Sequence, residues 1–155
     1  MKWTIDGSAI NWIAGQSTNF NAAFGAMTKL VADGDLSFCD ELVDELHRTA
    51  ENEPGALWAN TVKDQRHHTG AGMATLGWVM RNVAEIQDPE DKFDAAPHVI
   101  AQARALAADH PSLTVVTEDV LVKPTRRALS DVCDELGIPW LRVPEWMEAR
   151  GVAWP

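Results

Sequence analysis

The chain has 155 residues, 46% of them hydrophobic, and its 23 acidic and 13 basic side chains give a formal net charge of −10. This balance argues against a general nucleic-acid coat protein, which needs a basic face. It does not exclude a nuclease, because the clustered carboxylates of an enzyme that binds divalent metal add to the negative total. No apolar stretch approaches the roughly 18 residues of a membrane span, and no signal-peptide pattern precedes the first predicted strand. We therefore expect one cytoplasmic domain over residues 1–155.

Short apolar stretches alternate with helical segments along the chain. Four strands are predicted, at residues 2–6, 36–39, 113–117 ("LTVVT", the clearest) and 138–143. Apolar residues at three- and four-residue spacing predict eight helices. In the first half of the chain, one helix runs from residue 8 or 11 to 13, one follows a cap at 17–20, one starts at residue 40, and one lies around residue 58 after a Pro-Gly break. In the second half, the helices run from 73 to 86, from 97, over 128–137 and from 144. Strands separated by helices predict an α/β fold with a mainly parallel sheet.

The sequence has two cysteines, Cys39 and Cys133, which lie far apart in amphipathic segments. We predict two reduced, buried thiols rather than a disulfide, as is typical of cytoplasmic proteins. The adjacent His67 and His68 share no regular ligand spacing with these cysteines, so zinc is not favoured. A contact between Arg66 and a substrate phosphate is a better interpretation of that segment.

Two predicted strands run into acidic residues: the first ends on Asp6, and residues 113–117 lead into Glu118 and Asp119. If these strands are parallel neighbours, both carboxyl ends lie at the edge where open α/β sheets bind ligands. Carboxylates that meet there repel unless a cation lies between them, and Mg²⁺ or Mn²⁺ prefers such oxygen ligands. The pattern suits metal-assisted phosphodiester hydrolysis. Asp6 with the Gly-Ser that follows is equally consistent with a turn and a helix N-cap.

Four segments resemble motifs of PIN-domain ribonucleases, which include the VapC-like toxins, and they follow one another along the chain in the order that the family has them. "IDGSAI" (5–10) is similar to their opening strand and Asp-x-Ser/Thr, and "VVTEDV" (115–120) to a later strand, Thr, one residue and Asp. "FCDELVDELHR" (38–48) resembles the helix whose Glu-Leu supplies a second carboxylate, and "AAPHVIAQARAL" (95–106) the helix that usually begins Ala-Asp-Pro. The tail, 131–152, resembles a less characterised PIN-like branch, many of whose members are encoded beside helix-turn-helix regulators.

The resemblance implies a PIN-like three-layer α/β/α fold with a mainly parallel central sheet. It also implies a Mg²⁺- or Mn²⁺-dependent endoribonuclease, the toxin of a toxin–antitoxin pair, whose metal is held by Asp6, Glu45 and Asp119. An RNA substrate, a cognate antitoxin such as a helix-turn-helix regulator, and a homodimer are implied in the same way, and no membrane partner is expected. Glu41, one helical turn before Glu45, is an alternative second carboxylate.

Ala96 stands where the family has its third acidic residue. Either the chain is a naturally weakened or inactive member, or it is an Asp→Ala variant of an enzyme that poisons its host. In both cases we expect poor metal binding and slow or absent cleavage. Asp94, about 200° away around a helix, is expected to point away from the site unless the helix starts at Pro97 and the preceding loop folds inward.

Two function classes compete with the nuclease. Ala96 supports a catalytically inactive PIN-fold binding module that partners a regulator. A small metal-dependent phosphatase would use similar carboxylates, and turnover of small phosphate esters rather than RNA would distinguish it.

Five further side chains are candidates for substrate contacts. Ser8 is positioned to bond a metal ligand or water, or to cap a helix, and Thr117 has a similar role or ends a strand. Lys123, Arg126 and Arg127 follow Asp119 closely. They are predicted either to bind RNA phosphates or to form a solvated charge cluster at a helix start.

Overall fold

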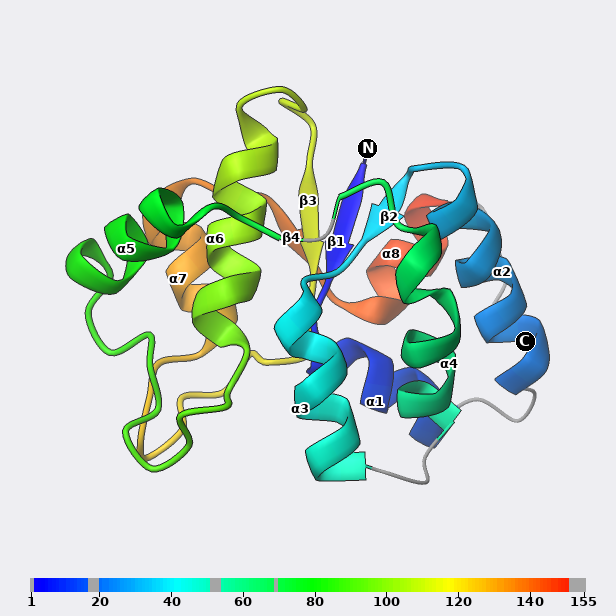
Figure 1. The fold of residues 1–155 in the computed structure, drawn as a ribbon, viewed down its shortest axis with the longest axis horizontal. Helices are drawn as coiled ribbons and strands as arrows, with labels where there is room; N and C mark the ends of the chain where they lie inside the picture. The colour runs from blue at the N-terminus through cyan, green and yellow to red at the C-terminus, as the bar shows by residue number, and fades with distance from the viewer. Residues whose placement is uncertain (1, 17–19, 51–53, 69, 151–155) are drawn as a thin grey trace.

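The computed structural model describes residues 2–16, 20–50, 54–68 and 70–150. In this part of the chain one four-stranded sheet has the order β2-β1-β3-β4, and all its neighbouring strands are parallel (Figure 1). Its strands are β1 (Trp3–Ile5), β2 (Leu36–Ser37), β3 (Thr114–Val116) and β4 (Trp140–Leu141). The predicted α/β class and parallel sheet are thus confirmed.

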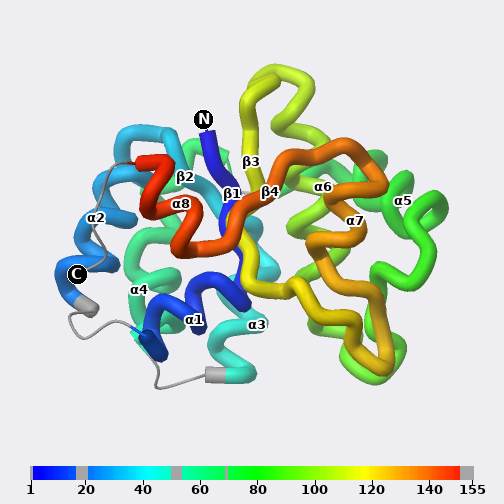
Figure 2. The backbone as a smooth tube through the Cα atoms, turned by 180° about the vertical axis from the view of Figure 1, so that it is seen from behind, coloured from blue at the N-terminus to red at the C-terminus, as the bar shows by residue number. Residues whose placement is uncertain are grey.

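Helices flank the strands on both sides (Figures 1 and 2), an arrangement compatible with three α/β/α layers. The helices are α1 (Gly7–Gln16), α2 (Phe20–Ala32), α3 (Asp40–Ala50), α4 (Pro54–Val62), α5 (Met73–Asn82), α6 (Ala96–Ala107), α7 (Leu129–Leu136) and α8 (Val143–Ala149), with a short 3-10 turn, η1, at Lys63–Gln65. Within the described ranges, none of them has both the length and the apolar character needed to cross a membrane.

Several element boundaries differ from the sequence-based prediction. The first helix begins at Gly7, with only Asp6 between it and β1, and α5 ends at Asn82 rather than at residue 86. The predicted break at Pro54 is instead the start of α4, because proline fits a first helical turn, where no N–H partner is needed. The predicted cap at 17–20 lies mostly outside the described residues.

The core lies between the sheet and its helices. Ile5, Val115 and Val116 on the two central strands are fully buried. Cys39 and Cys133 are also buried and unpaired, which confirms the prediction of reduced thiols. The short apolar runs that predicted the strands are therefore explained by burial from both sides.

The pairing of β1 with β3 fixes where the polar strand ends meet. Ile5 pairs with Val116, and the N–H of Asp6 donates to the carbonyl of Val116 across 3.2 Å. The residue after each strand therefore emerges at the same edge of the sheet. The prediction that the first strand and the strand at residues 113–117 are parallel neighbours is confirmed.

Candidate functional site

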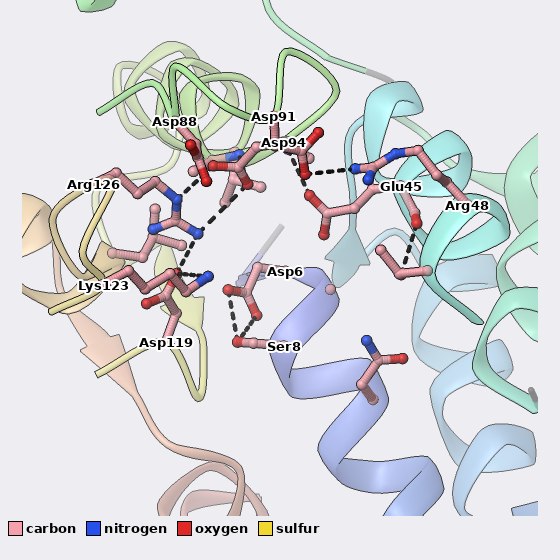
Figure 3. Close-up of a pocket in the computed structure, with 17 residues that line it drawn as sticks. Asp6, Ser8, Glu45, Arg48, Asp88, Asp91, Asp94, Asp119, Lys123 and Arg126 are labelled. Atoms are coloured by element: carbon pink, nitrogen blue, oxygen red, sulfur yellow. Dashed lines mark hydrogen bonds and ion pairs between the residues drawn. The ribbon is translucent and has the colours of Figure 1, made fainter. Parts of the chain in front are cut away.

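A pocket of about 240 Å³ lies at the carboxyl ends of β1 and β3 (Figure 3). Its walls come from the start of α1, the middle of α3, the loop before α6 and the segment after β3. Its charged lining is Asp6, Glu45, Asp88, Asp91, Asp94, Asp119, Arg48, Lys123 and Arg126. Acidic side chains outnumber basic ones there by six to three, so the pocket is anionic.

Asp6 both caps a helix and lines the pocket. Its Oδ1 accepts a hydrogen bond from the N–H of Ala9 (2.9 Å), which satisfies a donor in the first turn of α1. Burial raises the pKa of Asp6 to about 6, with a smaller contribution from the charge of Asp119, although hydrogen bonds from Thr117, Ala9 and Ser8 act in the opposite direction. Asp6 therefore forms the predicted helix cap and also lies in the pocket at the strand ends.

The hydroxyl groups of Ser8 and Thr117 connect the two strand ends through Asp6. Ser8 Oγ lies 2.8 and 2.9 Å from the two carboxylate oxygens, and Thr117 Oγ1 donates to Oδ2 across 2.6 Å. The same hydroxyls accept from the N–H groups of Glu118 (2.9 Å) and Asp119 (3.0 Å). Both residues therefore position carboxylates.

Glu45 reaches the pocket from α3. Its Oε2 accepts a hydrogen bond of 2.6 Å from the N–H of Ala95, at the start of α6. Desolvation, followed by the charges of Asp94 and Asp6, raises the pKa of Glu45 to about 7. The alternative candidate, Glu41, does not line this pocket.

Gly7 is a residue of the pocket that the sequence analysis missed. A Cβ at this position would collide with Glu45 Oε1 and would approach Leu42 Cδ1 to 3.0 Å. The Asp-Gly-Ser segment was the available signal, because glycine allows a close approach that a residue with a side chain does not.

Glu41, the alternative second carboxylate, contacts His98 instead of the pocket, with its Oε1 3.2 Å from Nδ1.

Asp119 has one occupied and one free carboxylate oxygen. Oδ2 forms an ion pair of 2.6 Å with Arg126 and a longer one of 3.6 Å with Lys123. Oδ1 is buried and has no hydrogen-bond partner among the described residues. An unpartnered buried carboxylate oxygen is costly, so Oδ1 of Asp119 is a candidate atom for contact with a ligand.

Arg126 is a buried cation between two carboxylates (Figure 3). Its side chain is 4% exposed, and its Nε donates to Asp94 Oδ2 across 2.5 Å while Nη2 pairs with Asp119. Nη1 donates to the carbonyl of Arg127 (2.8 Å). Because these contacts use the N–H groups of the guanidinium, they do not favour the predicted binding of RNA phosphate by Arg126.

The two neighbouring cations differ from Arg126. Arg127 pairs with Glu135 across 2.8 Å, away from the acidic pocket. Lys123 lines the pocket, and its side chain is 50% exposed. Of the three predicted phosphate contacts, Lys123 is the one whose position remains compatible with that role.

Asp94 lies in the pocket, so it does not point away as first expected, and the alternative of an inward-folded loop before the helix holds instead. Helix α6 begins at Ala96, and Asp94 belongs to the loop before it, which folds inward and brings its carboxylate to Arg126. Ala96 is 5% exposed and also lines the pocket. The position where the resemblance places an aspartate therefore faces the other carboxylates.

The family model described as "Domain of unknown function (DUF4411)" matches residues 13–154. The chain belongs to this family. Glu45, Ala96 and Asp119 fall inside the matched residues, whereas Asp6 and Ser8 precede them. Neither the curated proteins nor the solved structures contain a match to the chain.

The pocket of this DUF4411 member has oxygen donors of the kind that hard cations prefer. Across the described ranges, however, no group of three or more His, Cys, Asp or Glu side chains is arranged to hold a metal ion. Arg126 engages two of the pocket's carboxylates, Asp94 and Asp119.

The Arg66 segment lies apart from this pocket. The side chain of Arg66 is 3% exposed, donates to the carbonyls of Phe38 and Lys63 (2.7 Å each) and pairs with Asp40. It therefore ties a loop to the body of the protein, and its burial does not favour the phosphate contact considered for it. Nε2 of His67 lies 3.2 Å from the carbonyl of Ala32, which gives that ring a structural contact.

Proposed function

We propose that the chain is a PIN-like, Mg²⁺- or Mn²⁺-dependent endoribonuclease, the toxin of a toxin–antitoxin pair, and that Ala96 weakens its cleavage. One observation carries the proposal: Asp6, Glu45, Ala96 and Asp119, from four separate segments, all line one pocket. These are the positions at which the resemblance to PIN-domain ribonucleases expects acidic residues. The cytoplasmic location, the antitoxin partner and the homodimer follow from the resemblance alone.

The pocket offers oxygen donors of the kind that a divalent cation prefers, although in the described residues they are not arranged around one. Asp119 Oδ1 is buried without a partner among the described residues, and burial, together with neighbouring carboxylates, raises the pKa of Asp6 to about 6 and that of Glu45 to about 7. Asp6, Glu45 and Asp119 would hold the ion. When bound, Mg²⁺ or Mn²⁺ would lower the pKa of a water molecule and stabilise the negative charge that develops on the leaving oxygen.

The protein's own groups would position these ligands and the substrate. Thr117 and Ser8 orient the Asp6 carboxylate, and the N–H of Ala95 orients that of Glu45. Lys123, half exposed beside the pocket, would bind an RNA phosphate as a point charge. No covalent intermediate is needed, because the attacking group is water.

The proposal is tested with a labelled pool of structured and single-stranded RNA and the metal-free chain. We expect slow cleavage that requires added Mn²⁺ or Mg²⁺, stops with chelator and is abolished by Asp6→Asn. Asp33→Asn is the matched control, because Asp33 is an acidic residue that pairs with Lys29 outside the pocket. Turnover of small phosphate esters without RNA cleavage would instead indicate a phosphatase.

A binding module is the second candidate, and two observations favour it. Ala96 leaves the pocket one carboxylate short, and Arg126 engages two of the carboxylates that remain. In this case the fold would bind a regulator without cleaving RNA. Absence of cleavage, with Mn²⁺ bound or not, together with specific binding of the regulator encoded beside it, would establish this role.

A further inference from the structure

The loop before α6 carries an exposed aromatic ring beside the pocket. Of the aromatic side chains that the structure describes, Phe93 alone is more than half exposed, at 56%. Asp91 and Asp94, on either side of it in the chain, line the pocket. The ring also borders a hollow of about 120 Å³ next to α3, so there is free space beside it. One exposed apolar residue is common on a protein surface, so the groups around this ring decide its meaning.

Two cations flank the ring of Phe93. Cζ of Arg48 lies 5.7 Å from the ring centroid, and Nζ of Lys92 lies 5.0 Å from it. Both distances are within the range of cation–π contacts. An exposed ring with neighbouring cations is the combination that binds single-stranded nucleic acid, because a base stacks on the ring while the cations bind phosphates.

The carboxylate of Asp91 holds the ring and the guanidinium together. Its Oδ1 accepts a hydrogen bond of 3.1 Å from the N–H of Phe93, and its Oδ2 accepts one of 3.0 Å from Nη2 of Arg48. The first bond is a local turn contact of the kind that aspartate favours. One side chain therefore sets both the backbone that carries the ring and the cation beside it.

Arg48 differs from the buried arginines in having free donors. Its side chain is 37% exposed and lines the pocket, whereas those of Arg66 and Arg126 are 3% and 4% exposed. Within the described ranges its guanidinium makes one hydrogen bond, the one to Asp91. The remaining N–H groups can therefore bind phosphate oxygens in the paired geometry that suits a guanidinium.

The charges of the pocket direct an anionic strand to its rim. Figure 3 shows Arg48 and Lys123 on opposite sides of the pocket, with Asp6 between them. Both cations are at least one-third exposed, while the acidic residues outnumber the basic ones in the lining as a whole. Phosphates are therefore attracted to the two sides of the mouth and repelled from its centre.

We propose that Phe93 stacks on an unpaired base of single-stranded RNA and that Arg48 binds a neighbouring phosphate of the same strand. The inference rests on the proposed function, because it takes RNA as the substrate class. It deepens that function by assigning the contact with unpaired bases to the loop before α6. A single strand is required, because only an unpaired base offers its face to a side chain.

Binding of a short fluorescent single-stranded RNA to the chain, measured by anisotropy in chelator, tests the stacking contact without cleavage. Phe93→Leu keeps an apolar side chain but removes the ring, and it should raise the Kd at least about 5-fold, the lower end for one base–aromatic contact. Phe93→Trp should retain the original Kd. On a strand of equal length that lacks bases, the original chain and Phe93→Leu should bind equally.

The salt dependence of the same binding tests Arg48. Arg48→Gln should reduce the slope of log Kd against log salt by about 0.7, the value for one phosphate of a single strand. Arg104→Gln is the matched control, because Arg104 is an exposed arginine that lies 3.5 Å from the centroid of the Trp78 ring, outside the pocket lining. Its slope should equal that of the original chain.

Three results would overturn the inference: no binding of RNA, an unchanged Kd in Phe93→Leu, or an equal loss on the strand without bases. If Phe93→Leu instead loses a protein regulator while its RNA affinity is unchanged, the surface belongs to a protein partner and the inference also fails. RNA cleavage is scored separately. Binding that depends on Phe93 without cleavage would keep this contact and remove the nuclease, whereas undiminished cleavage by Phe93→Leu would keep the nuclease and remove the contact.

Discussion

Thr117 Oγ1 lies 2.6 Å from Oδ2 of Asp6, a hydrogen bond between residues at the carboxyl ends of two neighbouring parallel strands. The hydroxyl also accepts from the N–H of Asp119, so one side chain orients both a carboxylate and the segment that carries the next one. The carboxylates of the pocket are therefore arranged by local hydrogen bonds in the metal-free protein.

Replacing Thr117 by valine should raise the pKa of Asp6 further above about 6. The Thr117 hydrogen bond is the largest contribution that lowers this pKa, and valine keeps the shape of the side chain without the donor. Carbon NMR titration of the carboxyl groups in the metal-free protein measures the change. Thr114→Val is the control, because its hydroxyl bonds to the carbonyl of Ser112, away from the pocket. If the pKa of Asp6 is the same in both variants, the hydrogen bond from Thr117 does not lower it.

The stability of the metal-free protein should depend on pH through Asp6. Its pKa rises from 3.8 to about 6 on folding, so the folded chain takes up a proton. This contribution is complete below about pH 4 and is lost as the pH rises through 6. Its size is on the order of 2–3 kcal/mol, because each pKa unit corresponds to about 1.4 kcal/mol.

Comparison with Asp6→Asn isolates this effect from other titrating groups. Urea unfolding of both proteins between pH 4 and pH 8 should show the original chain losing stability relative to the variant as the pH rises. A difference that stays constant across this range would mean that the Asp6 carboxyl is not destabilised by burial.

Gly7→Ala should displace the Glu45 carboxylate without unfolding the protein. The added Cβ would collide with Oε1, the far end of a flexible side chain, and Glu45 can move aside. We expect Mn²⁺ affinity to fall by roughly 10-fold or more, the scale for a disturbed ligand. Gly15→Ala in the same helix is the control, because nothing lies within 4 Å of a Cβ there. If both variants bind Mn²⁺ equally, Glu45 is not a ligand.

The two cations beside Asp119 should contribute very differently to folding. Arg126→Met leaves two buried carboxylates without their cation and should cost about 3–5 kcal/mol, the scale for breaking a buried ion pair. Lys123→Ala removes a half-exposed partner at 3.6 Å and should cost less than about 1 kcal/mol. Urea unfolding at pH 7 measures both values, and similar costs would contradict the buried role of Arg126.

The parts of the site that were predictable come from local sequence patterns. Residues 113–117 are β-branched and apolar, so a strand ending before Asp119 was expected, and the same reasoning placed Asp6. Glu45 was separable from Glu41 only through the resemblance, because both residues occupy one helix face.

The missed features depend on contacts distant in the sequence. Asp94 was expected to point away because helical geometry was assumed, but its loop is held by Arg126, which lies 32 positions later. Arg126 itself stands in a charged run that is typical of solvated surface, and sequence pattern alone does not predict its burial. Gly7 is needed because Glu45 packs against it from another helix.

Restoration of an aspartate at position 96 tests the central claim most directly. RNA cleavage with Mn²⁺ should be compared between the chain and Ala96→Asp, with Asp6→Asn in the restored background to exclude a contaminating nuclease. Position 96 lines the pocket, so the account predicts a strong gain of metal-dependent cleavage that Asp6→Asn abolishes. A restored protein that remains inert on a broad RNA pool, and whose expression is harmless to cells, would contradict the nuclease and favour the binding module.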